Sequence, residues 1–508
     1  MSEVNKVLHG IAKGAGIVFL GTIISMFFGF LSVVIIARYF STAEYGIYNM
    51  AWTILNIAMV IAMLGFPNSL PREIAYYKEK EPLKIGCLIS TALTIILLVS
   101  LSVTAFLIFG SIYIAQIFNE EMLIYTLKIM SLALPFLALT GTFVAISQGF
   151  GRVREKVYFQ NILYPILWFS FLGLVVIMKL NFYYIFVSYV IAQVITFFAL
   201  AIDVFKKRLF KIDIIDLELG KELIKLSIPL MFTGIAGFIM TWTDTLMLGF
   251  YKTSEAVGLY NAAASLAKLL PIVLYSAGFI YPPLATALYA QGKINKLKRV
   301  YQVLTKWMFL ATLPLFILMF LFPEATLGFF FGEKYLEASS ILQILALGFM
   351  FHTLLGLNGL SLIVIKESNF VMYSTLISAV INVFLNVLLI QSYGIKGAAI
   401  ATAISYFTTN VLNSLRLYQK AKVHPFSRNY IKVVVISLIM SGFVWILHFK
   451  MLNILYASLV LIAFLIVYLL LLLLSKSIDK EDIDLLLAIE RKIGINLSIL
   501  KKVLQRFI

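Results

Sequence analysis

Long apolar stretches and short polar connections alternate along almost the whole chain. Each stretch has about 20 residues or more, the length that a helix needs to cross a hydrocarbon layer roughly 30 Å thick. No polar block large enough for a soluble domain separates them. The pattern predicts an all-α integral membrane protein with about fourteen transmembrane helices. The predicted spans cover roughly residues 12–36, 46–66, 85–109, 124–148, 157–178, 182–204, 226–250, 257–280, 304–323, 339–363, 370–391, 396–415, 430–448 and 452–475.

Composition agrees with this pattern. Of the 508 residues, 62% are hydrophobic and only 13% are charged, whereas soluble domains carry about 25% charged residues. The first apolar run is longer than the core of a signal peptide, so we expect the first helix to remain in the mature protein. The single cysteine, Cys87, excludes an internal disulfide and a cysteine-based metal cluster. No cofactor and no metal site are expected.

The net charge of +17 follows a membrane topology rather than a nucleic-acid surface. With the N-terminus inside, most Lys and Arg residues fall in cytoplasmic connections, in agreement with the positive-inside rule. The outer connections carry only Arg38, Lys128, Lys179, Lys252, Lys334, Lys396 and Lys450. This asymmetry predicts a multi-pass protein of the cell (plasma) membrane with both termini in the cytoplasm. It gives no support to a nucleic-acid partner.

One phrase occurs twice, as STAEYGIYNMA at residues 41–51 and as TSEAVGLYNAA at residues 253–263. Both copies fall at the predicted outer mouth of a helix pair. An even number of predicted helices separates them, so the two copies have the same orientation in the membrane. This arrangement indicates a parallel repeat of two six-helix lobes, related by a pseudo-twofold axis along the membrane normal.

The repeat defines the expected domains. They are an N-terminal lobe (1–204), a cytoplasmic connection (205–225), a C-terminal lobe (226–418), two additional transmembrane helices (419–475) and an amphipathic cytoplasmic tail (476–508). The tail has apolar residues at helical spacing between charges, which suits contact with the inner membrane surface or a solvated cap. Two parallel lobes around a central cavity suit alternating access.

Two charged residues lie at membrane depth in the second predicted lobe, Asp244 in TWTDTLML and Lys268 in SLAKLLP. An unpaired charge there costs about 2.5–3.5 kcal/mol on insertion scales, so each residue indicates a partner or a cavity. One interpretation is a structural pair that joins two neighbouring helices. The other places Lys268 in the cavity as a point charge for an anionic group, while Asp244 tunes it or responds to a coupling cation or proton.

Further basic candidates for substrate binding are Arg38, Arg72 and Lys13, which lie near the ends of the first two predicted spans. An anionic substrate would have to be held at successive heights, and the planar guanidinium of Arg suits bidentate contacts with groups such as phosphate. The alternative is ordinary anchoring at the membrane interface, with the long side chains extended toward the head groups.

The repeated phrase supplies four more substrate-binding candidates: Tyr48, Asn49, Tyr260 and Asn261. Aromatic faces and amides suit sugar rings near an outer exit, although capping of helix ends explains these residues equally well. His352 has no His, Cys or carboxylate cluster near it in the sequence, so it does not indicate a metal site.

Several phrases together resemble the polysaccharide-transport (Wzx-type) flippases of the multidrug/oligosaccharidyl-lipid/polysaccharide exporter superfamily. The resemblance runs from about residue 8 to about residue 475. It implies two six-helix lobes plus two helices around a cavity. The phrases are ARYFSTAEYGIYNMA, LGFPNSLPREIA, IPLMFTGIAGFIMTWTDTLMLGFYKTSEAVGLYNAAASLAKL, YPPLATAL, FGEKYLEASSILQILALG and YGIKGAAIATAISY.

The resemblance also implies a function, namely movement of a polyprenyl-pyrophosphate-linked oligosaccharide from the cytoplasmic to the outer leaflet. Membrane lipids and glycan-assembly proteins are the other expected partners, and the chain is expected to act as a monomer. A multidrug or metabolite cation antiporter and a peptidoglycan-precursor flippase of the same superfamily remain alternatives. A membrane polymerase or ligase is a third, but the short outer loops hold no catalytic constellation, so we expect no enzyme.

Overall fold

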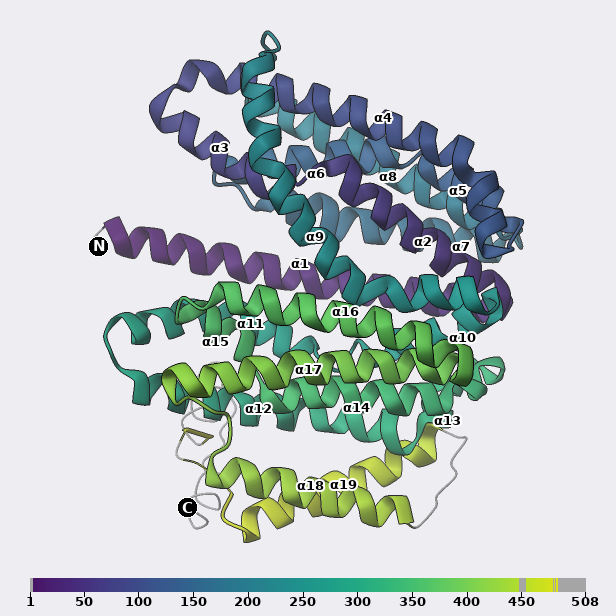
Figure 1. Ribbon diagram of the computed structural model, residues 1–508, viewed down its shortest axis with the longest axis vertical. Helices are drawn as coiled ribbons and strands as arrows, with labels where there is room; N and C mark the ends of the chain where they lie inside the picture. The colour runs from purple at the N-terminus through teal and green to yellow at the C-terminus, as the bar shows by residue number, and fades with distance from the viewer. Residues whose placement is uncertain (1–2, 447–453, 478, 480, 483–508) are drawn as a thin grey trace. The chain divides into compact units, whose positions relative to one another are not determined.

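The computed structural model describes residues 3–446, 454–477, 479 and 481–482 (Figure 1). All regular structure assigned in these ranges is helical, which confirms the predicted all-α fold. The predicted amphipathic tail lies outside the described residues from residue 483 onward. The elements are α1 (Glu3–Tyr39), α2 (Thr42–Met63), α3 (Phe66–Lys80), η1 (Pro82–Lys84), α4 (Ile85–Phe118), α5 (Met122–Ser131), α6 (Leu134–Gly149), η2 (Lys156–Leu163), α7 (Tyr164–Ile177), α8 (Tyr183–Lys206), α9 (Leu217–Tyr251), α10 (Ser254–Ala267), α11 (Ile272–Ala290), α12 (Ile294–Leu321), α13 (Pro323–Phe330), η3 (Glu333–Ala338), α14 (Ser339–Leu355), α15 (Asn358–Val364), α16 (Ser368–Tyr393), α17 (Ile395–Ala421), α18 (Arg428–Ile446) and α19 (Ile454–Leu474).

The helices fit a membrane protein. Within the described part of the chain, 11 helices are long and apolar enough to cross a membrane, or 12 when α10 and the first part of α11, bent by 53°, count as one span. The predicted spans 226–250 and 396–415 lie within α9 and α17. The membrane class is therefore confirmed, whereas the count of fourteen spans and the cytoplasmic termini stay predictions.

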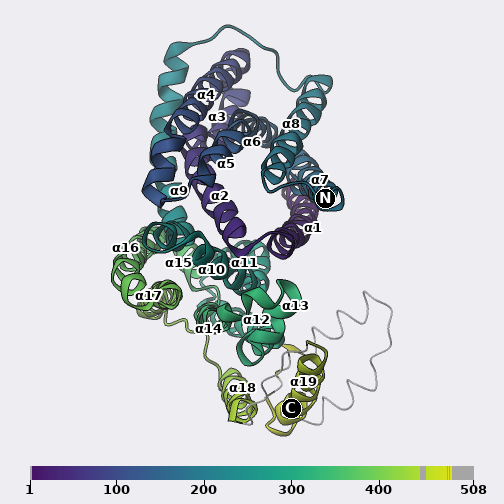
Figure 2. The same cartoon turned by 90° about the vertical axis from the view of Figure 1, so that its right-hand side faces the viewer.

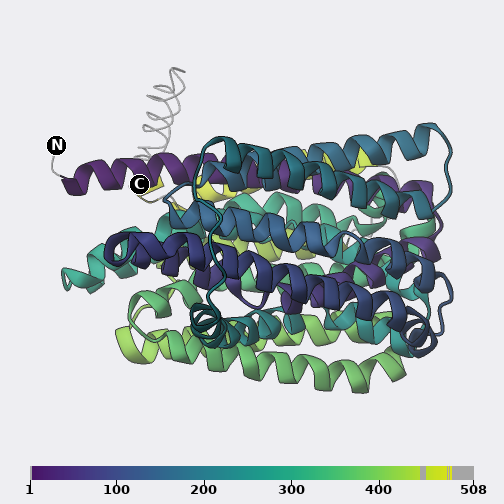
Figure 3. The same ribbon diagram turned by 90° about the horizontal axis from the view of Figure 1, so that it is seen from above.

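The chain divides into two compact units. The first consists of Met1–Asn261 with Ile390–Ile395, and the second of Ala262–Leu389 with Lys396–Ile508. In the first unit α9 packs against α2, α3 and α4, so this helix groups with the helices that precede it in the chain. Figure 2 shows α9 along one edge of this unit, beside α2 and α4, and Figure 3 shows most of the helices that precede α9 running in a common direction. The predicted lobe boundaries stay a prediction.

The connection between α8 and α9 is tied to α4 by backbone hydrogen bonds. Asp213 N donates to Ser90 Oγ (2.8 Å), and Asp216 N donates to Thr91 Oγ1 (2.9 Å). Asp216 is also the N-cap of α9, because its side chain accepts from the backbone of Glu218 (2.9 Å). The basic connection predicted at 205–225 is therefore extended only as far as residue 216, and α9 begins within it.

A capping box fixes the start of α2, where the first copy of the repeated phrase lies. Ser41 Oγ accepts from Glu44 N (3.2 Å), and Glu44 Oε2 accepts from Ser41 N (2.8 Å). This reciprocal pair satisfies two backbone donors that would otherwise lack partners at a helix N-terminus. The phrase therefore begins as a well-defined helix end.

The two copies of the phrase touch each other through their glycines. A Cβ atom at Gly46 would lie 1.7 Å from Ser254 O, and a Cβ at Gly258 would lie 2.1 Å from Thr42 O. Each glycine thus packs on the carbonyl four residues before the other glycine, and only a residue without a side chain fits there. Contacts exchanged in this way are those that a two-fold axis generates. The beginnings of α2 and α10 therefore meet in a locally two-fold arrangement.

A break between α14 and α15 interrupts the helical path in the second unit. Gly356 adopts φ +69°, and a Cβ there would lie 2.3 Å from Thr305 Oγ1, so glycine is needed for both conformation and space. The last carbonyls of α14 lose their helical partners at this break. Tyr430 Oη donates to Leu354 O (2.8 Å), and Tyr301 Oη donates to Leu355 O. Two buried tyrosines, from α18 and α12, therefore stabilise the break.

Candidate functional site

Three of the predicted site residues lie together where α9 and α10 pack. Tyr260 Oη donates to Asp244 Oδ2 at 2.5 Å, and Thr245 Oγ1 donates to Asn261 Oδ1 at 3.2 Å. In each pair the two residues are 16 positions apart in the chain, on either side of the short turn that joins α9 to α10. All four side chains are buried. We call Asp244, Thr245, Tyr260 and Asn261 the α9–α10 polar cluster.

Asp244 is the chemically distinctive member of this cluster, with only 4% of its surface exposed. A hydrogen bond from a phenol to a carboxylate is charge-assisted and short, and it offsets part of the cost of burying the carboxylate. Asn261 is held by a second bond, from Nδ2 to Val257 O (3.0 Å). The cluster can therefore hold a carboxylate at membrane depth within a defined hydrogen-bond frame.

Tyr48 and Asn49 lie on α2 and are buried. Asn49 Nδ2 donates to Tyr45 O (2.7 Å), which is a local bond within the helix. The ring of Tyr48 packs beside Trp52 with centroids 6.0 Å apart and an interplanar angle of 28°. Tyr48 therefore belongs to an aromatic cluster, whereas Asn49 is engaged by its own helix.

Sequence reasoning missed this aromatic cluster, which continues onto α7 and α8. Trp168 lies 6.0 Å from Trp52 at 12°, and 6.3 Å from Tyr164 at 5°. Trp168 Nε1 and Tyr164 Oη are buried and have no hydrogen-bond partner among the described residues. The signal in the sequence was the spacing of Tyr48 with Trp52 and of Tyr164 with Trp168, four residues in each case, which places each pair on one helix face.

The three basic candidates at the ends of the first spans occupy different places. Arg38 is exposed in the last turn of α1. Arg72 is on α3, where its side chain is 74% exposed and its Nε lies 4.0 Å from Glu73 Oε1. Lys13 is in α1. These placements suit interfacial positions, and the predicted phosphate contacts stay predictions.

Lys268 lies directly after α10 and is half-buried. It belongs to the second unit, whereas Asp244 belongs to the first. The proposed pairing of these two side chains therefore stays a prediction. One described partner of Asp244 is the phenol of Tyr260, which belongs to the second copy of the repeated phrase.

A charged cluster that the sequence did not predict surrounds Glu155 in the first unit. The Glu155 side chain is 1% exposed, and its Oε1 lies 2.7 Å from Arg152 Nη2 and 3.3 Å from Lys207 Nζ. Burial alone would raise the pKa of Glu155, but hydrogen bonds from the backbone, Arg152 and Lys207 hold that pKa below its usual range. The carboxylate is therefore the buried centre of the Glu155 cluster.

A second cluster, in the second unit, surrounds Lys306 of α12. Its side chain is 1% exposed, and Nζ donates to Asp479 and to Asp482 Oδ2 (2.5 Å). Arg299 forms a fork with Glu481, with Nε to Oε1 at 2.7 Å and Nη2 to Oε2 at 2.6 Å. Hence the segment after α19 is attached to α12 by the Lys306 cluster.

Solved structures with a similar fold are membrane transporters. The fold matches an inward closed conformation of the lipid II flippase MurJ, with a TM-score of 0.75 and 18% identity over 90% of this chain and 98% of that one. It also matches an inward-facing multidrug resistance MATE family transporter of the MOP superfamily, with a TM-score of 0.63, 13% identity, and 78% and 94% of the chains covered. The chain therefore shares the fold of these two solved structures.

Sequence comparison then defines the family. The model described as "Polysaccharide biosynthesis protein" matches residues 11–288, more than half of the chain, and the protein belongs to this family. The model described as MatE matches residues 229–388. A relative from Haloferax volcanii, named "Probable low-salt glycan biosynthesis flippase Agl15", is 24% identical over 405 residues, covering 80% of this chain and 83% of its own. These findings confirm the family resemblance that the sequence phrases indicated.

Proposed function

We propose that the protein moves a polyprenyl-pyrophosphate-linked oligosaccharide from the cytoplasmic to the outer leaflet of the plasma membrane, for export of a surface polysaccharide or glycan. The observation that carries the proposal is the family match over residues 11–288. It is supported by the name of the Haloferax volcanii relative and by the fold shared with a lipid II flippase. Translocation requires no bond to be made or broken, so the proposal assigns no catalytic residue.

In this proposal the two halves of the chain alternate between inward-open and outward-open states, as parallel repeats allow. The sugar head group passes through a polar interior while the polyprenyl tail stays in the bilayer. The protein acts as a monomer with both termini in the cytoplasm. Lys268 supplies a point charge to the pyrophosphate, and Arg38, Arg72 and Lys13 hold it at other heights.

The α9–α10 polar cluster has a separate role in this proposal. Its buried carboxylate at Asp244 responds to a coupling cation or proton, because a change of charge at membrane depth alters the local free energy by several kcal/mol. Tyr260 adjusts its hydrogen bond to the carboxylate as that charge changes. Tyr48 and Asn49 contribute to an aromatic and amide surface near the exit.

The test is reconstitution in liposomes with a panel of polyprenyl-pyrophosphate-linked oligosaccharides. Transfer between leaflets is measured with and without proton and cation gradients. We expect the wild-type protein to transfer at least one of these substrates, and Lys268→Glu to abolish transfer at normal expression. Lys396→Glu, the same charge reversal at an exposed position of α17, is the matched control. Wild-type liposomes that transfer none of the panel would contradict the proposal.

A multidrug or metabolite cation antiporter is the second candidate, favoured by the MatE match over residues 229–388. The two functions differ in cargo charge, since a cationic drug needs acidic contacts whereas a pyrophosphate needs basic ones. The same liposomes, loaded with a fluorescent cationic dye and subjected to an ion gradient, separate them. Dye export without glycan transfer would favour the antiporter.

A further inference from the structure

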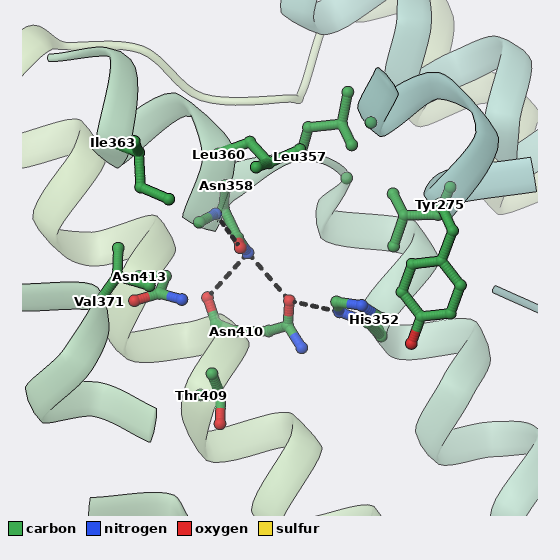
Figure 4. A pocket seen from close by; sticks show the side chains of 14 residues that line it. Tyr275, His352, Leu357, Asn358, Leu360, Ile363, Val371, Thr409, Asn410 and Asn413 are labelled. Atoms are coloured by element: carbon green, nitrogen blue, oxygen red, sulfur yellow. Dashed lines mark hydrogen bonds between the residues drawn. The ribbon is translucent and has the colours of Figure 1, made fainter. Parts of the chain in front are cut away.

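A cavity of about 580 Å³ lies within the second unit, beside the break between α14 and α15 (Figure 4). Its walls come from α11, α14, α15, α16 and α17. The polar residues of the lining are Tyr275, His352, Asn358, Thr409, Asn410 and Asn413, and the remaining lining residues are apolar. This volume falls within the 300–1,000 Å³ range typical of small-molecule sites, which combine apolar walls with a few oriented polar groups.

Two of these polar residues, Asn358 and Asn410, form a hydrogen-bonded amide frame. Asn358 Nδ2 lies 3.0 Å from Asn410 Oδ1 and 3.1 Å from Ser414 Oγ, and Asn358 Oδ1 accepts from Gly359 N at 2.6 Å. Asn410 Nδ2 donates to Tyr406 O (2.7 Å). Both amides therefore bond to the protein through nitrogen and through oxygen, which fixes their orientation.

This frame determines the tautomer of His352. His352 Nδ1 lies 2.9 Å from Asn410 Oδ1, an atom that can only accept. The neutral imidazole therefore carries its proton on Nδ1, which leaves Nε2 as an acceptor. No described residue donates to Nε2. Figure 4 shows the imidazole between Asn410 and Tyr275, on the wall of the cavity.

Asn413 and Tyr275 supply the complementary groups. Asn413 Oδ1 accepts from Ser374 Oγ (2.7 Å), so the Asn413 amide is oriented and its Nδ2 remains a donor. A Cβ at Gly359 would lie 3.5 Å from this nitrogen, in van der Waals contact. Tyr275 is 50% exposed, and its ring lies 6.5 Å from that of His352 at 56°. The cavity thus offers one acceptor, one donor and an aromatic face.

The charge of the lining limits the ligand. None of the 14 lining residues, all within the described chain, is acidic or basic apart from the neutral imidazole. An ion would lose its hydration here without gaining a counter-charge, which is costly in an apolar surrounding. A ligand that fits must therefore be uncharged, must both donate and accept hydrogen bonds, and must present an apolar face. A pyranose ring has these three properties.

We propose that this cavity is a subsite for one uncharged sugar ring. His352 Nε2 accepts from one hydroxyl, Asn413 Nδ2 donates to a second oxygen, and Tyr275 covers the apolar face of the ring. The physiological source of the sugar rests on the proposed function, since the glycan of a lipid-linked substrate would supply it. A neutral membrane glycolipid shares the same chemistry.

The binding test uses the full chain in phospholipid nanodiscs that contain no glycolipid. Octyl β-D-glucoside is titrated calorimetrically, with octanol and octyl phosphate as comparison ligands. We expect the glucoside to bind at least tenfold more tightly than either comparison ligand. We also expect His352→Phe and Asn413→Leu each to weaken its binding at least tenfold. His424→Phe, the same change in the connection after α17, should leave it unaltered. Equal affinity in the wild type and His352→Phe, or equal binding of octanol, would overturn the proposal.

A second measurement covers variants that fold poorly. In the wild-type protein, the glucoside should slow amide hydrogen exchange across residues 356–363, which flank the cavity. Protection elsewhere only would overturn the proposal.

Leaflet transfer separates the sugar subsite from the flippase proposal. Normal transfer and normal glucoside binding by His352→Phe remove the subsite but leave the flippase proposal intact. Specific glucoside binding by a wild-type protein that transfers no glycan retains the subsite and removes the flippase proposal.

A further experiment identifies the source of the sugar. The transfer assay is run in two kinds of bilayer, one without glycolipid and one that contains it. Competition by the lipid-linked oligosaccharide against octyl β-D-glucoside supports the transported glycan as the ligand. Competition by the neutral glycolipid alone would overturn that assignment.

Discussion

The Glu155 and Lys306 clusters have the same arrangement of charged side chains, with the signs of the charges reversed. In each, one side chain that is 1% exposed is held between two groups of opposite sign. Their reach along the chain differs. Glu155 is bound by Arg152, three residues away, and by Lys207, whereas Lys306 binds Asp479 and Asp482, 173 and 176 residues away.

The surroundings of the two clusters also differ. Arg152 and Lys207 are each 37% exposed, so water can solvate them if Glu155 is lost. Asp479 is only 9% exposed, and if Lys306 were lost it would stay buried with Arg299, 2.9 Å away, as its remaining cation among the described residues. Removal of one member of a buried ion pair is costly because the other charge is left uncompensated. The comparison teaches that the cost of breaking a cluster depends on the group left behind.

Of the changes that test this comparison, Lys306→Met is expected to lower the stability of the protein most. It should destabilise the protein by about 3–5 kcal/mol, since Lys306 is removed from two carboxylates and the buried Asp479 keeps only Arg299 as a described cation. The segment after α19 should also become accessible to protease. Thermal unfolding and limited proteolysis measure the two effects, and Lys296→Met, an exposed lysine of the same helix, is the control. An unchanged unfolding temperature would show that the Lys306 cluster does not hold this segment.

Glu155→Gln should lower the free energy of unfolding by less. The loss should lie near the low end of the roughly 1.5–3 kcal/mol range for hydrogen bonds to charged groups. The amide keeps the shape and one acceptor, and both cations can reach water. The same unfolding assay measures it, with Glu79→Gln at an exposed position as the matched control. A loss as large as that of Lys306→Met would contradict the solvation argument.

Mild acid should lower the stability of the protein least, and it should weaken both clusters. Arg299 lowers the pKa of Glu481, and hydrogen bonds from Lys306, Arg299 and Asn429 lower the pKa of Asp479 against the opposing effect of burial. The unfolded chain therefore takes up protons first, near the ordinary values of about 4. The stabilisation is present above that pH and decreases as the pH falls through the lower folded values.

The measurement is the unfolding temperature between pH 7 and pH 4 at constant ionic strength. We expect a decline that begins near pH 5 in the wild type and is shallower in Glu155→Gln, which has one fewer carboxyl with a lowered pKa. A stability that rises on acidification would contradict the charge assignment of both clusters.

Much of the fold could be predicted because apolar runs report burial in lipid directly. What hydropathy could not show is where a span breaks. Pro135 lies inside the predicted span 124–148, yet it stands in the first turn of α6, after α5 has ended at Ser131. Proline fits that position because the missing N–H has no helical acceptor there. Pro229 and Pro314 also lie inside predicted spans, but they stand within the continuous helices α9 and α12.

The sites were less predictable than the spans, because their members come from distant helices. Asp244 is buried in the structure, but its phenol partner could not be predicted because it depends on how α9 meets α10. The frame around His352 joins Asn358 to Asn410, 52 residues apart. A single sequence carries no record of such pairs, and His352 therefore looked isolated.

The glycine contact between α2 and α10 has a consequence for the history of the chain. Because each glycine rests on the main chain of the opposite copy, a mutation that adds bulk in one copy displaces both helix ends. No compensating change in a neighbouring side chain can relieve the overlap, since the obstacle is a peptide carbonyl. The two copies of the phrase are thus constrained to keep glycine at both positions, even where the residues around them change.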